Sequence, residues 1–227
     1  MNHDENLLDA LQRGETVDMI VDHLRRGILN GQYAPGQRLI SRDLMNEIGV
    51  SRGPVREAFG RLSAAGLIEL TPNRGAAVKR FTRREIKNVF QIREMLEGLA
   101  ASLAAQQIGV GDNRKRLQDM QELLSGISPG DIQAFMNSNR LLHRLIVDMS
   151  TNPELGVLID RMALPIMMVQ LRRLMSEDDQ RCSRNEHDDI LRALFTGDPD
   201  EAEKAMRRHL RQSAQRFMRL PPSAFSD

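Results

Sequence analysis

The sequence predicts a mainly α-helical chain in two domains. Three helices and a β-hairpin come first, and an all-α bundle of six or seven helices follows. The composition is rich in residues that favour helices and has only 4% aromatic residues. Apolar residues recur at helical spacing through most of the 227 residues. One stretch differs, because residues 67–80 have the pattern of two short strands around a glycine-containing turn.

The changes in pattern give the expected domain boundaries. Residues 1–15 are polar and are expected to form a mobile arm. Residues 16–80 form the first domain, 81–84 a linker and 85–220 the helical domain. A short tail is expected at 221–227.

The composition indicates a soluble protein of the cytoplasm. The net charge is +1, so any surface for nucleic acid must be local. The single cysteine, Cys182, excludes an internal disulfide framework and suits a reducing compartment. No apolar run approaches the ~18 residues of a membrane span, and the N-terminal stretch lacks the apolar core of a signal peptide. We expect no membrane partner.

The first domain has clear start and stop signals. Helical spacing predicts a first helix from Thr16 to a stop at Gly31. A second, short helix is expected between a cap at Ser41 and a stop at Gly49, and a third from a cap at Ser51. Three helices and a β-hairpin in this order are the layout of a winged helix-turn-helix.

Two arginines mark the third helix as a candidate recognition helix. Arg52 and Arg56 lie four residues apart and share one face of its first turns. Such turns enter the major groove of DNA, where arginine makes bidentate contacts with guanine. Gly53 lets the backbone approach phosphate, and Ser51 contributes a hydroxyl beside a helix N-terminus. Residues 36–80 carry eight Arg or Lys against four Asp or Glu. DNA binding is favoured over a winged helix that docks on protein.

The stretch PGQRLISRDLMNEIGVSRGPVREAFGRLSAAGLIELTPNRGAAV closely resembles the N-terminal domain of the GntR family of bacterial transcription regulators. It departs mildly from the family pattern, with Met45 in place of Ala and Phe59 in place of Leu. The resemblance implies DNA contacts from the second helix, the third helix and the wing tip, namely Arg42, Ser51, Arg52, Gly53, Arg56 and Gly75. We add Arg74 for its charge and place in the wing, and expect Arg61 to lie off the groove.

The second domain is expected to be entirely helical. Helices are predicted near 83–107, 112–126, 129–150, 153–175, 184–196 and 199–219. Thr82 and Glu85 form a predicted capping box, and Asp198 caps the last helix ahead of Pro199. Pro165 is expected to kink or split the fourth of these helices.

Three histidines of this domain are predicted to point inward. His143, His187 and His209 lie on different helices, and each has apolar neighbours at helical spacing. Asn139 precedes His143 by one turn on the same face. Imidazole suits divalent transition metals such as Zn²⁺ and Ni²⁺. The residues alone leave two readings open, a shared metal site or three core histidines.

Four motifs resemble the FadR-type C-terminal domain, the FCD group of the same family. They are Arg93–Glu97, Asn139–His143, Glu186–Asp198 and Met206–Leu210. The resemblance implies a bound divalent metal, zinc or nickel first, with Asn139, His143, His187 and His209 as ligands. Asn139 stands where the family has Asp and brings no negative charge, so the metal is expected to bind more weakly and to need an anionic effector.

The sequence therefore predicts a homodimeric regulator of transcription. It is expected to bind a pseudo-palindromic, double-stranded operator and to be controlled by a small carboxylate. Candidate effector contacts are Arg93 and Arg140, although Arg93 could instead pair with Glu94, Glu97 or a facing helix. We expect no enzyme and name no catalytic residue, because H-E-x-x-H and a glycine-rich phosphate loop are absent. Two alternatives stay open: a bundle that only dimerises and holds no metal, and a metal-dependent hydrolase.

Overall fold

The computed structural model describes residues 3–72, 74–162 and 175–226, with side chains from residue 14 onward. The described residues form two compact units, which are treated separately. Of the described residues, those up to Arg80 form the winged unit, and 81–162 and 175–225 form the helical unit. The mainly α-helical class is confirmed, with one small sheet near the N-terminus. Among the described helices, none is both long and apolar enough to cross a membrane.

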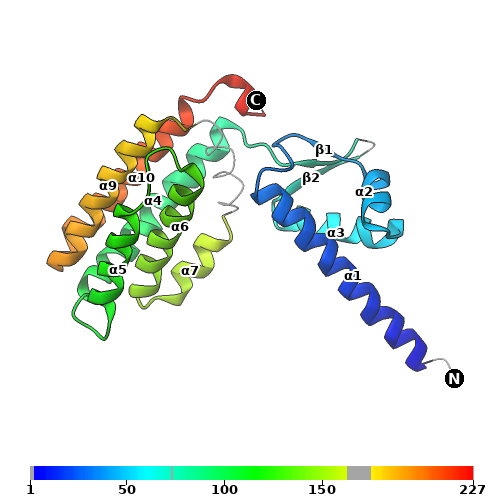
Figure 1. Cartoon of the computed structure of the whole chain (residues 1–227), viewed down its shortest axis with the longest axis horizontal. Helices are drawn as coiled ribbons and strands as arrows, with labels where there is room; N and C mark the ends of the chain where they lie inside the picture. Colours follow the sequence, from blue (N-terminus) through cyan, green and yellow to red (C-terminus); the bar gives the residue numbers. More distant parts are fainter. Residues whose placement is uncertain (1–2, 73, 163–174, 227) are drawn as a thin grey trace. The chain divides into compact units, whose positions relative to one another are not determined.

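The winged unit contains three helices and a three-stranded antiparallel sheet (Figure 1). In chain order the elements are α1 (His3–Leu29), β1 (Arg38–Leu39), α2 (Ser41–Ile48), α3 (Arg52–Ala64), β2 (Ile68–Thr71) and β3 (Gly75–Val78). The strand order is β1-β3-β2, with Arg38 paired to Ala77 and Ile68 paired to Val78. The predicted hairpin is confirmed. Strand β1 was not predicted, because two residues are too few to show alternation.

The core of the winged unit lies between α1 and α3. One face of α1 buries apolar residues at helical spacing, and the apolar face of α3 packs against it. These side chains are Val17, Ile20, Leu24 and Ile28 from α1, and Val55, Ala58, Phe59 and Leu62 from α3. Beyond α1, Tyr33 lies so close to Gly27 that a Cβ at Gly27 would stand 2.4 Å from the ring. Glycine at this position therefore lets the tyrosine pack on the helix.

The arm expected at the N-terminus is instead the beginning of α1. The helix starts at His3 and continues without a break through residues 3–15 into the predicted first helix. Leu7, Leu8 and Leu11 have helical spacing, which the polar composition of the stretch hides.

The helical unit is a bundle of α-helices (Figure 1). Its described elements are α4 (Arg83–Gln106), α5 (Asn113–Ser125), α6 (Ile132–Met149), α7 (Pro153–Asp160), α9 (Glu177–Thr196), α10 (Pro199–Met218) and the 3₁₀ turn η1 (Pro222–Ala224). Helix α4 packs along α10 and also contacts α6, α7 and α9. The two helices approach closely at Gly98, where a Cβ would stand 2.7 Å from Arg207 Cγ.

Capping explains where these helices begin. The predicted capping box of Thr82 and Glu85 is confirmed, as is the Asp198 cap of α10. Helix α9 begins at Glu177, seven residues before the predicted start at 184. The polar stretch that looked like a break is its first two turns, because Ser176 and Asp179 form a second capping box.

Two further expectations concern the ends of segments. The helix predicted over 153–175 begins as α7, which ends at Asp160, and Pro165 lies outside the described residues. The expected tail is partly packed on the bundle: Phe225 is buried, and the Arg83 guanidinium lies 4.0 Å from the centre of its ring. A guanidinium at this distance is attracted by the face of the ring, so this contact helps to hold Phe225 on the bundle.

Candidate metal centre and candidate nucleic-acid interface

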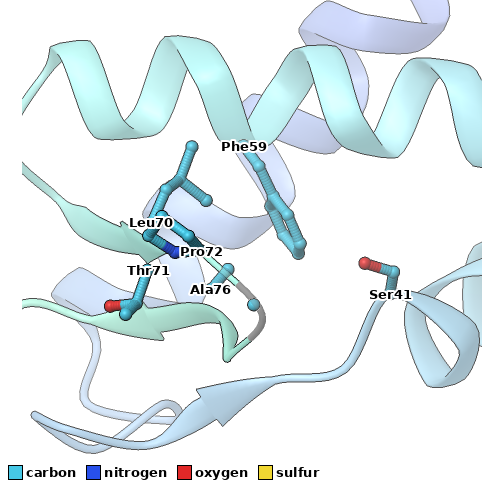
Figure 2. Close-up of a pocket in the computed structure, with 7 residues that line it drawn as sticks. Ser41, Phe59, Leu70, Thr71, Pro72 and Ala76 are labelled. Carbon is cyan, nitrogen blue, oxygen red and sulfur yellow. The ribbon is translucent and has the colours of Figure 1, made fainter.

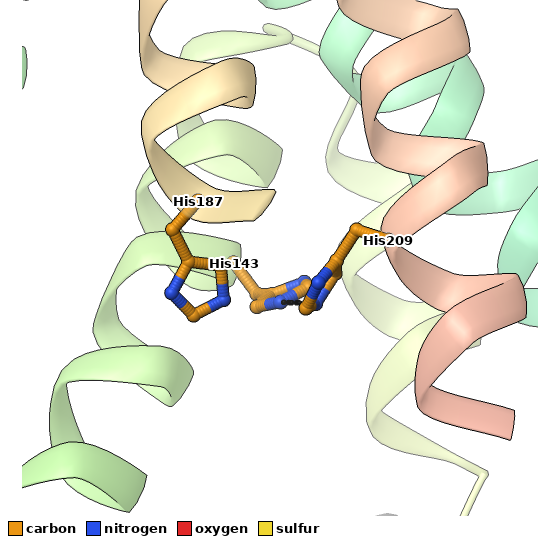
Figure 3. Close-up of side chains that lie close together, drawn as sticks. All are labelled: His143, His187 and His209. Carbon is orange, nitrogen blue, oxygen red and sulfur yellow. Dashed lines mark hydrogen bonds between the residues drawn. The ribbon is translucent and has the colours of Figure 1, made fainter. Parts of the chain in front are cut away.

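Three imidazole rings from three helices meet inside the helical unit. His143 comes from α6, His187 from α9 and His209 from α10 (Figure 3). One nitrogen from each ring lies within 4.8 Å of the others. The Nε2 atoms of His143 and His209 are 3.2 Å apart. The structure thus brings together the three histidines that the sequence places on separate helices.

Two carboxylates hold two of these rings from behind. Glu97 on α4 accepts a hydrogen bond from His143 Nδ1 through Oε2, and its Oε1 lies 2.6 Å from Arg93 Nε. On the other side, Glu186 Oε2 lies 2.7 Å from His209 Nδ1. Both oxygens of Glu186 also accept hydrogen bonds from Arg216, at 2.7 Å each. Both carboxylates are therefore held in place by an arginine as well as by a histidine.

This hydrogen bonding decides what the facing nitrogens can do. An ionised carboxylate only accepts hydrogen bonds, so the Nδ1 atoms of His143 and His209 must donate. In a neutral imidazole the other nitrogen is then an acceptor. The two Nε2 lone pairs consequently face each other across 3.2 Å. They repel unless a proton or a metal cation lies between them.

The local electrostatics favour an ionised Glu97 and neutral rings at His187 and His209. Burial raises the pKa of Glu97, but Arg93 and His143 outweigh burial, and its pKa lies well below the usual range. Burial is the main cause that lowers the pKa of His187 and of His209 well below 6.5, and the neighbouring histidines add to it. His187 and His209 are therefore uncharged, which is the form of imidazole that binds metals.

His187 lacks the hydrogen bonds that a buried imidazole needs. Both of its ring nitrogens are buried, and neither has a hydrogen-bond partner in the structure described here. Its ring stacks on Phe135, with centroids 6.3 Å apart. A buried polar group without a partner is costly, and native proteins satisfy nearly all of them. This orphaned imidazole fits a metal ligand better than a core residue.

The distance between the rings of His143 and His209 also fits one shared ion. Two imidazole nitrogens at ~2.1 Å from a tetrahedral or octahedral ion lie roughly 3.0–3.4 Å apart. The 3.2 Å between His143 Nε2 and His209 Nε2 falls in this interval. Borderline metals such as zinc and nickel suit an all-imidazole set.

The other predicted residues of this unit lie in different surroundings. Asn139 is half-buried on α6, one turn before His143. Arg140 is exposed and makes no hydrogen bond or ion pair with another described residue, so it does not join the buried cluster. Arg93 is buried and pairs with Glu97, which is one of the salt bridges foreseen for it.

Sequence reasoning missed the roles of Glu97, Glu186 and Arg216. Glu186 does lie on another face of α9 than His187, but this face packs against α10, where the side chain reaches His209. The signal available in the sequence was the pair of motifs, Arg93–Glu97 and Glu186–His187, each of which places a carboxylate near a predicted ligand.

We expect the metal-free protein to lose stability as the pH falls below about 6.5. In the unfolded chain the His187 imidazole binds a proton near pH 6.5, whereas in the folded chain its lowered pKa keeps it neutral. At His187 the unfolded state then holds one more proton, and this ring alone lowers the free energy of unfolding by roughly 1.4 kcal/mol per pH unit until its folded pKa is reached. His209, whose pKa is lowered in the same way, adds to the slope. Urea unfolding with a chelator, between about pH 7.5 and pH 5, measures this slope. His187→Leu should reduce it, and equal slopes in both proteins would contradict a neutral, buried His187.

The winged unit carries a second candidate site, for nucleic acid. Arg42, Arg52, Arg56 and Arg74 are all exposed, and none forms an ion pair with another described residue. Arg61 on the same helix behaves differently, because it pairs with Asp18 and Glu57 at 2.7 Å each. The unpaired arginines are free to bind phosphate or base edges.

The starts of α2 and α3 differ from the prediction. Ser41 is the first residue of α2, and Ile40 is the N-cap of this helix. Ser51 is the N-cap of α3, as predicted. Neither Ile40 nor Ser51 caps its helix through a side-chain hydrogen bond. The first N–H groups of α3 therefore remain open to an anion. A Cβ at Gly53 would meet nothing within 4 Å, so packing in the winged unit does not require glycine there. Gly75 begins β3 with φ +82°, a conformation that favours glycine.

An open pocket of about 320 Å³ lies between the hairpin, the start of α2 and the middle of α3 (Figure 2). Phe59 and Leu70 form much of its apolar surface, and Ser41 and Thr71 contribute hydroxyls. None of the residues that line it is titratable. It has no chemistry of its own and is part of the surface beside the predicted DNA contacts.

Comparison with known proteins divides the chain at the same place. Residues 16–78 match the family described as "Bacterial regulatory proteins, gntR family", and residues 88–212 match the FCD domain. The chain is 28% identical to a probable D-xylose utilization operon transcriptional repressor of Paenarthrobacter nicotinovorans, over 88% of each chain. It is 27% identical to the HTH-type transcriptional repressor RspR of Escherichia coli, over 85% of this chain and 84% of the relative. Among solved structures, McbR/YncC of Escherichia coli aligns with a TM-score of 0.71 and 25% identity, over 89% of this chain and 97% of the other.

Proposed function

Since this chain belongs to the GntR family of bacterial regulatory proteins, with a C-terminal FCD domain, it is a DNA-binding transcription regulator. We propose that a small carboxylic acid in the helical unit controls its affinity for a pseudo-palindromic operator. Its relatives are named as repressors and regulators of transcription, not as enzymes. The observation that carries the proposal is the convergence of three buried imidazoles. Two of them are held by carboxylates, and the third has no hydrogen-bond partner among the described residues.

We propose that His143, His187 and His209 hold a divalent metal, zinc or nickel, with Asn139 as a possible oxygen ligand. When bound, such an ion supplies positive charge and open positions for oxygen atoms of an acid. The protein supplies three imidazoles in a buried, pre-arranged set. Arg93 is already present beside His143 through Glu97, and its remaining N–H groups are the proposed contact for the carboxylate. The exposed position of Arg140 gives no support for its role as a second contact.

For DNA we propose that the winged unit binds through the starts of α2 and α3 and the wing. The proposed contacts are Arg42, Ser51, Arg52, Gly53, Arg56, Arg74 and Gly75. Support comes from their exposure, from the lack of ion pairs to other described residues and from the open N-terminus of α3. Arg52 and Arg56 would read bases, while Ser51 and the backbone at Gly53 would hold phosphate.

The test measures how the affinity for the operator depends on the effector and on the metal. An operator is first selected from random duplexes with the purified protein. Fluorescence anisotropy then follows its binding with a panel of small carboxylic acids, with Zn²⁺ or Ni²⁺ present and after chelation. We expect one acid to change the affinity by roughly 5–150-fold, corresponding to ~1–3 kcal/mol of coupling, and to lose this effect when the metal is removed. Affinity that no acid changes, with metal loaded, would contradict the proposal and favour a bundle that only dimerises.

We further propose that α4 joins two copies of the chain. Ile92, Met95 and Leu99 are about half exposed, at 53%, 56% and 44%, and lie on one face of α4 at spacings of three and four residues. An apolar stripe of this kind is typical of a helix that packs against a partner. A two-fold dimer would match the two half-sites of a pseudo-palindrome.

Met95→Glu is therefore expected to break the dimer. The charge would be buried in an apolar contact, which costs several kcal/mol when the charge has no partner. Light scattering after size exclusion should show a monomer, and affinity for the full operator should fall by roughly 10-fold or more because the half-sites are then bound separately. Leu123→Glu on α5, also an exposed apolar position, is the matched control and should remain like the wild type. A dimeric Met95→Glu protein would show that α4 is not the interface.

A further inference from the structure

Two hydrogen-bonded series of side chains lead to the histidines from opposite sides, and both run from an arginine through a glutamate to a histidine. These two series are called chains below. On one side Arg93 binds Glu97, and Glu97 binds His143. On the other side Arg216 binds Glu186, and Glu186 binds His209. Each chain is an arginine, a glutamate and a histidine, and the two meet at the pair of Nε2 atoms. At His187, the third ring, neither nitrogen has a hydrogen-bond partner among the described residues.

The carboxylate oxygens in both chains are already occupied. Glu97 uses Oε1 for Arg93 and Oε2 for His143. Glu186 uses Oε1 for Arg216, and Oε2 for both Arg216 and His209. The arginines thus hold each carboxylate against the far side of its ring. Each glutamate therefore contacts the Nδ1 side of its ring, whereas the two rings approach each other through Nε2.

We infer that Glu97 and Glu186 are positioning residues of the proposed metal site, an inference that rests on the function proposed above. Each glutamate fixes the proton of its histidine on Nδ1 and aims the Nε2 lone pair at the shared centre. A carboxylate that accepts a hydrogen bond from one ring nitrogen also makes the other nitrogen more basic, so that it binds a metal more strongly. Arg93 and Arg216 in turn keep the two carboxylates in place.

This arrangement determines which ions the site should accept. Because both glutamates are turned away and Asn139 is neutral, the ligand set brings no negative charge of its own. Imidazole-only sets suit zinc, nickel and copper, whereas magnesium, calcium and manganese require carboxylate or carbonyl oxygens. The site should therefore bind Zn²⁺ and Ni²⁺ and reject Mg²⁺ and Ca²⁺. It should also bind the metal more tightly when an anionic oxygen ligand is added.

The test is a competition titration of Zn²⁺ and of Ni²⁺ on the full-length protein. The variants are Glu97→Gln, Glu186→Gln, Glu97→Leu and Glu186→Leu. We expect the leucine variants to bind 10–100-fold more weakly, and the glutamine variants to lose less because an amide oxygen still accepts from Nδ1. The matched control is Glu94→Gln, also on α4, whose carboxylate pairs with Arg207 and Arg211 at 3.1 Å and is not bonded to any described histidine. It should bind metal like the wild type.

A second measurement reads the position of the ring protons without any metal. Nitrogen-15 NMR of the histidines distinguishes a proton on Nδ1 from one on Nε2. In the metal-free wild type, His143 and His209 should both carry a proton on Nδ1, and each leucine variant should change only the ring that its glutamate touches. Thermal unfolding of each variant checks that it is folded, and a glutamine variant replaces any leucine variant that is not.

The outcomes separate the two proposals. Metal affinities of the glutamate variants within twofold of Glu94→Gln, with unchanged ring protons, would overturn the positioning role. Wild-type protein that binds neither Zn²⁺ nor Ni²⁺ would overturn the proposed metal function instead. In that case the NMR measurement still decides whether the glutamates set the proton position. Tight binding of Mg²⁺ would overturn the predicted selectivity.

Discussion

His209→Ala is expected to abolish metal retention. After loading with zinc or nickel and dialysis, the wild type should retain about one ion per chain, and the variant almost none. His209 provides one of the three imidazoles of the cluster, and its Nε2 lies 3.2 Å from His143 Nε2. Without it, two rings and the amide of Asn139 remain, a neutral set too small to hold a divalent ion through dialysis. Elemental analysis measures the metal content directly.

His23→Ala provides the control for this experiment. His23 is half-exposed, lies in the winged unit and contacts Tyr33 and Glu47, so its loss should leave the metal content unchanged. If His209→Ala retained as much metal as the wild type, the ion would be bound elsewhere. Wild-type protein without metal would return the three histidines to the role of core residues and direct the search for the effector to the metal-free protein.

Arg52→Ala is expected to weaken operator binding by about 1–3 kcal/mol, or roughly 5–150-fold. Arg52 lies in the first turn of α3, is exposed and forms no ion pair with another described residue, so its guanidinium is available to a base edge. Random duplex DNA should lose far less affinity, because it offers no specific base at that position. Anisotropy titrations on both DNAs, at one salt concentration, give the two losses.

Arg61→Ala is the matched control on the same helix. Its guanidinium is already bound to Asp18 and Glu57, so operator affinity should change little. Equal losses on operator and random DNA for Arg52→Ala would identify Arg52 as a phosphate contact, and base reading by this residue would be wrong.

Local signals account for what the sequence predicted correctly. The hairpin follows from strand-like runs around Gly75, and the starts of α4 and α10 follow from the caps at Thr82 and Asp198. The convergence of the histidines followed from helical phase, since each ring lies on the apolar face of its own helix. A bundle buries such faces together, which brings residues from three helices to one place.

Long-range contacts explain what the sequence did not reveal. Helical phase places Glu186 away from His187, and only the packing of α9 on α10 brings it to His209. Similarly, no pattern in the sequence around Phe225 predicts its contact with Arg83 at the start of α4. The polar start of α9 was mistaken for a loop because Asp and Glu are typical of both loops and first helical turns.

The packing of Tyr33 on Gly27 has a consequence for how the two units can be observed. The chain has one tyrosine and no tryptophan, so its intrinsic emission comes from the winged unit alone. Circular dichroism, in contrast, is dominated by helices of both units. A ligand of the helical unit raises the unfolding temperature of that unit by mass action. Tyrosine emission does not report this binding unless the winged unit also changes. A shift in tyrosine emission on addition of metal or acid would thus be an optical record, without any label, of a signal reaching the half of the protein that binds DNA.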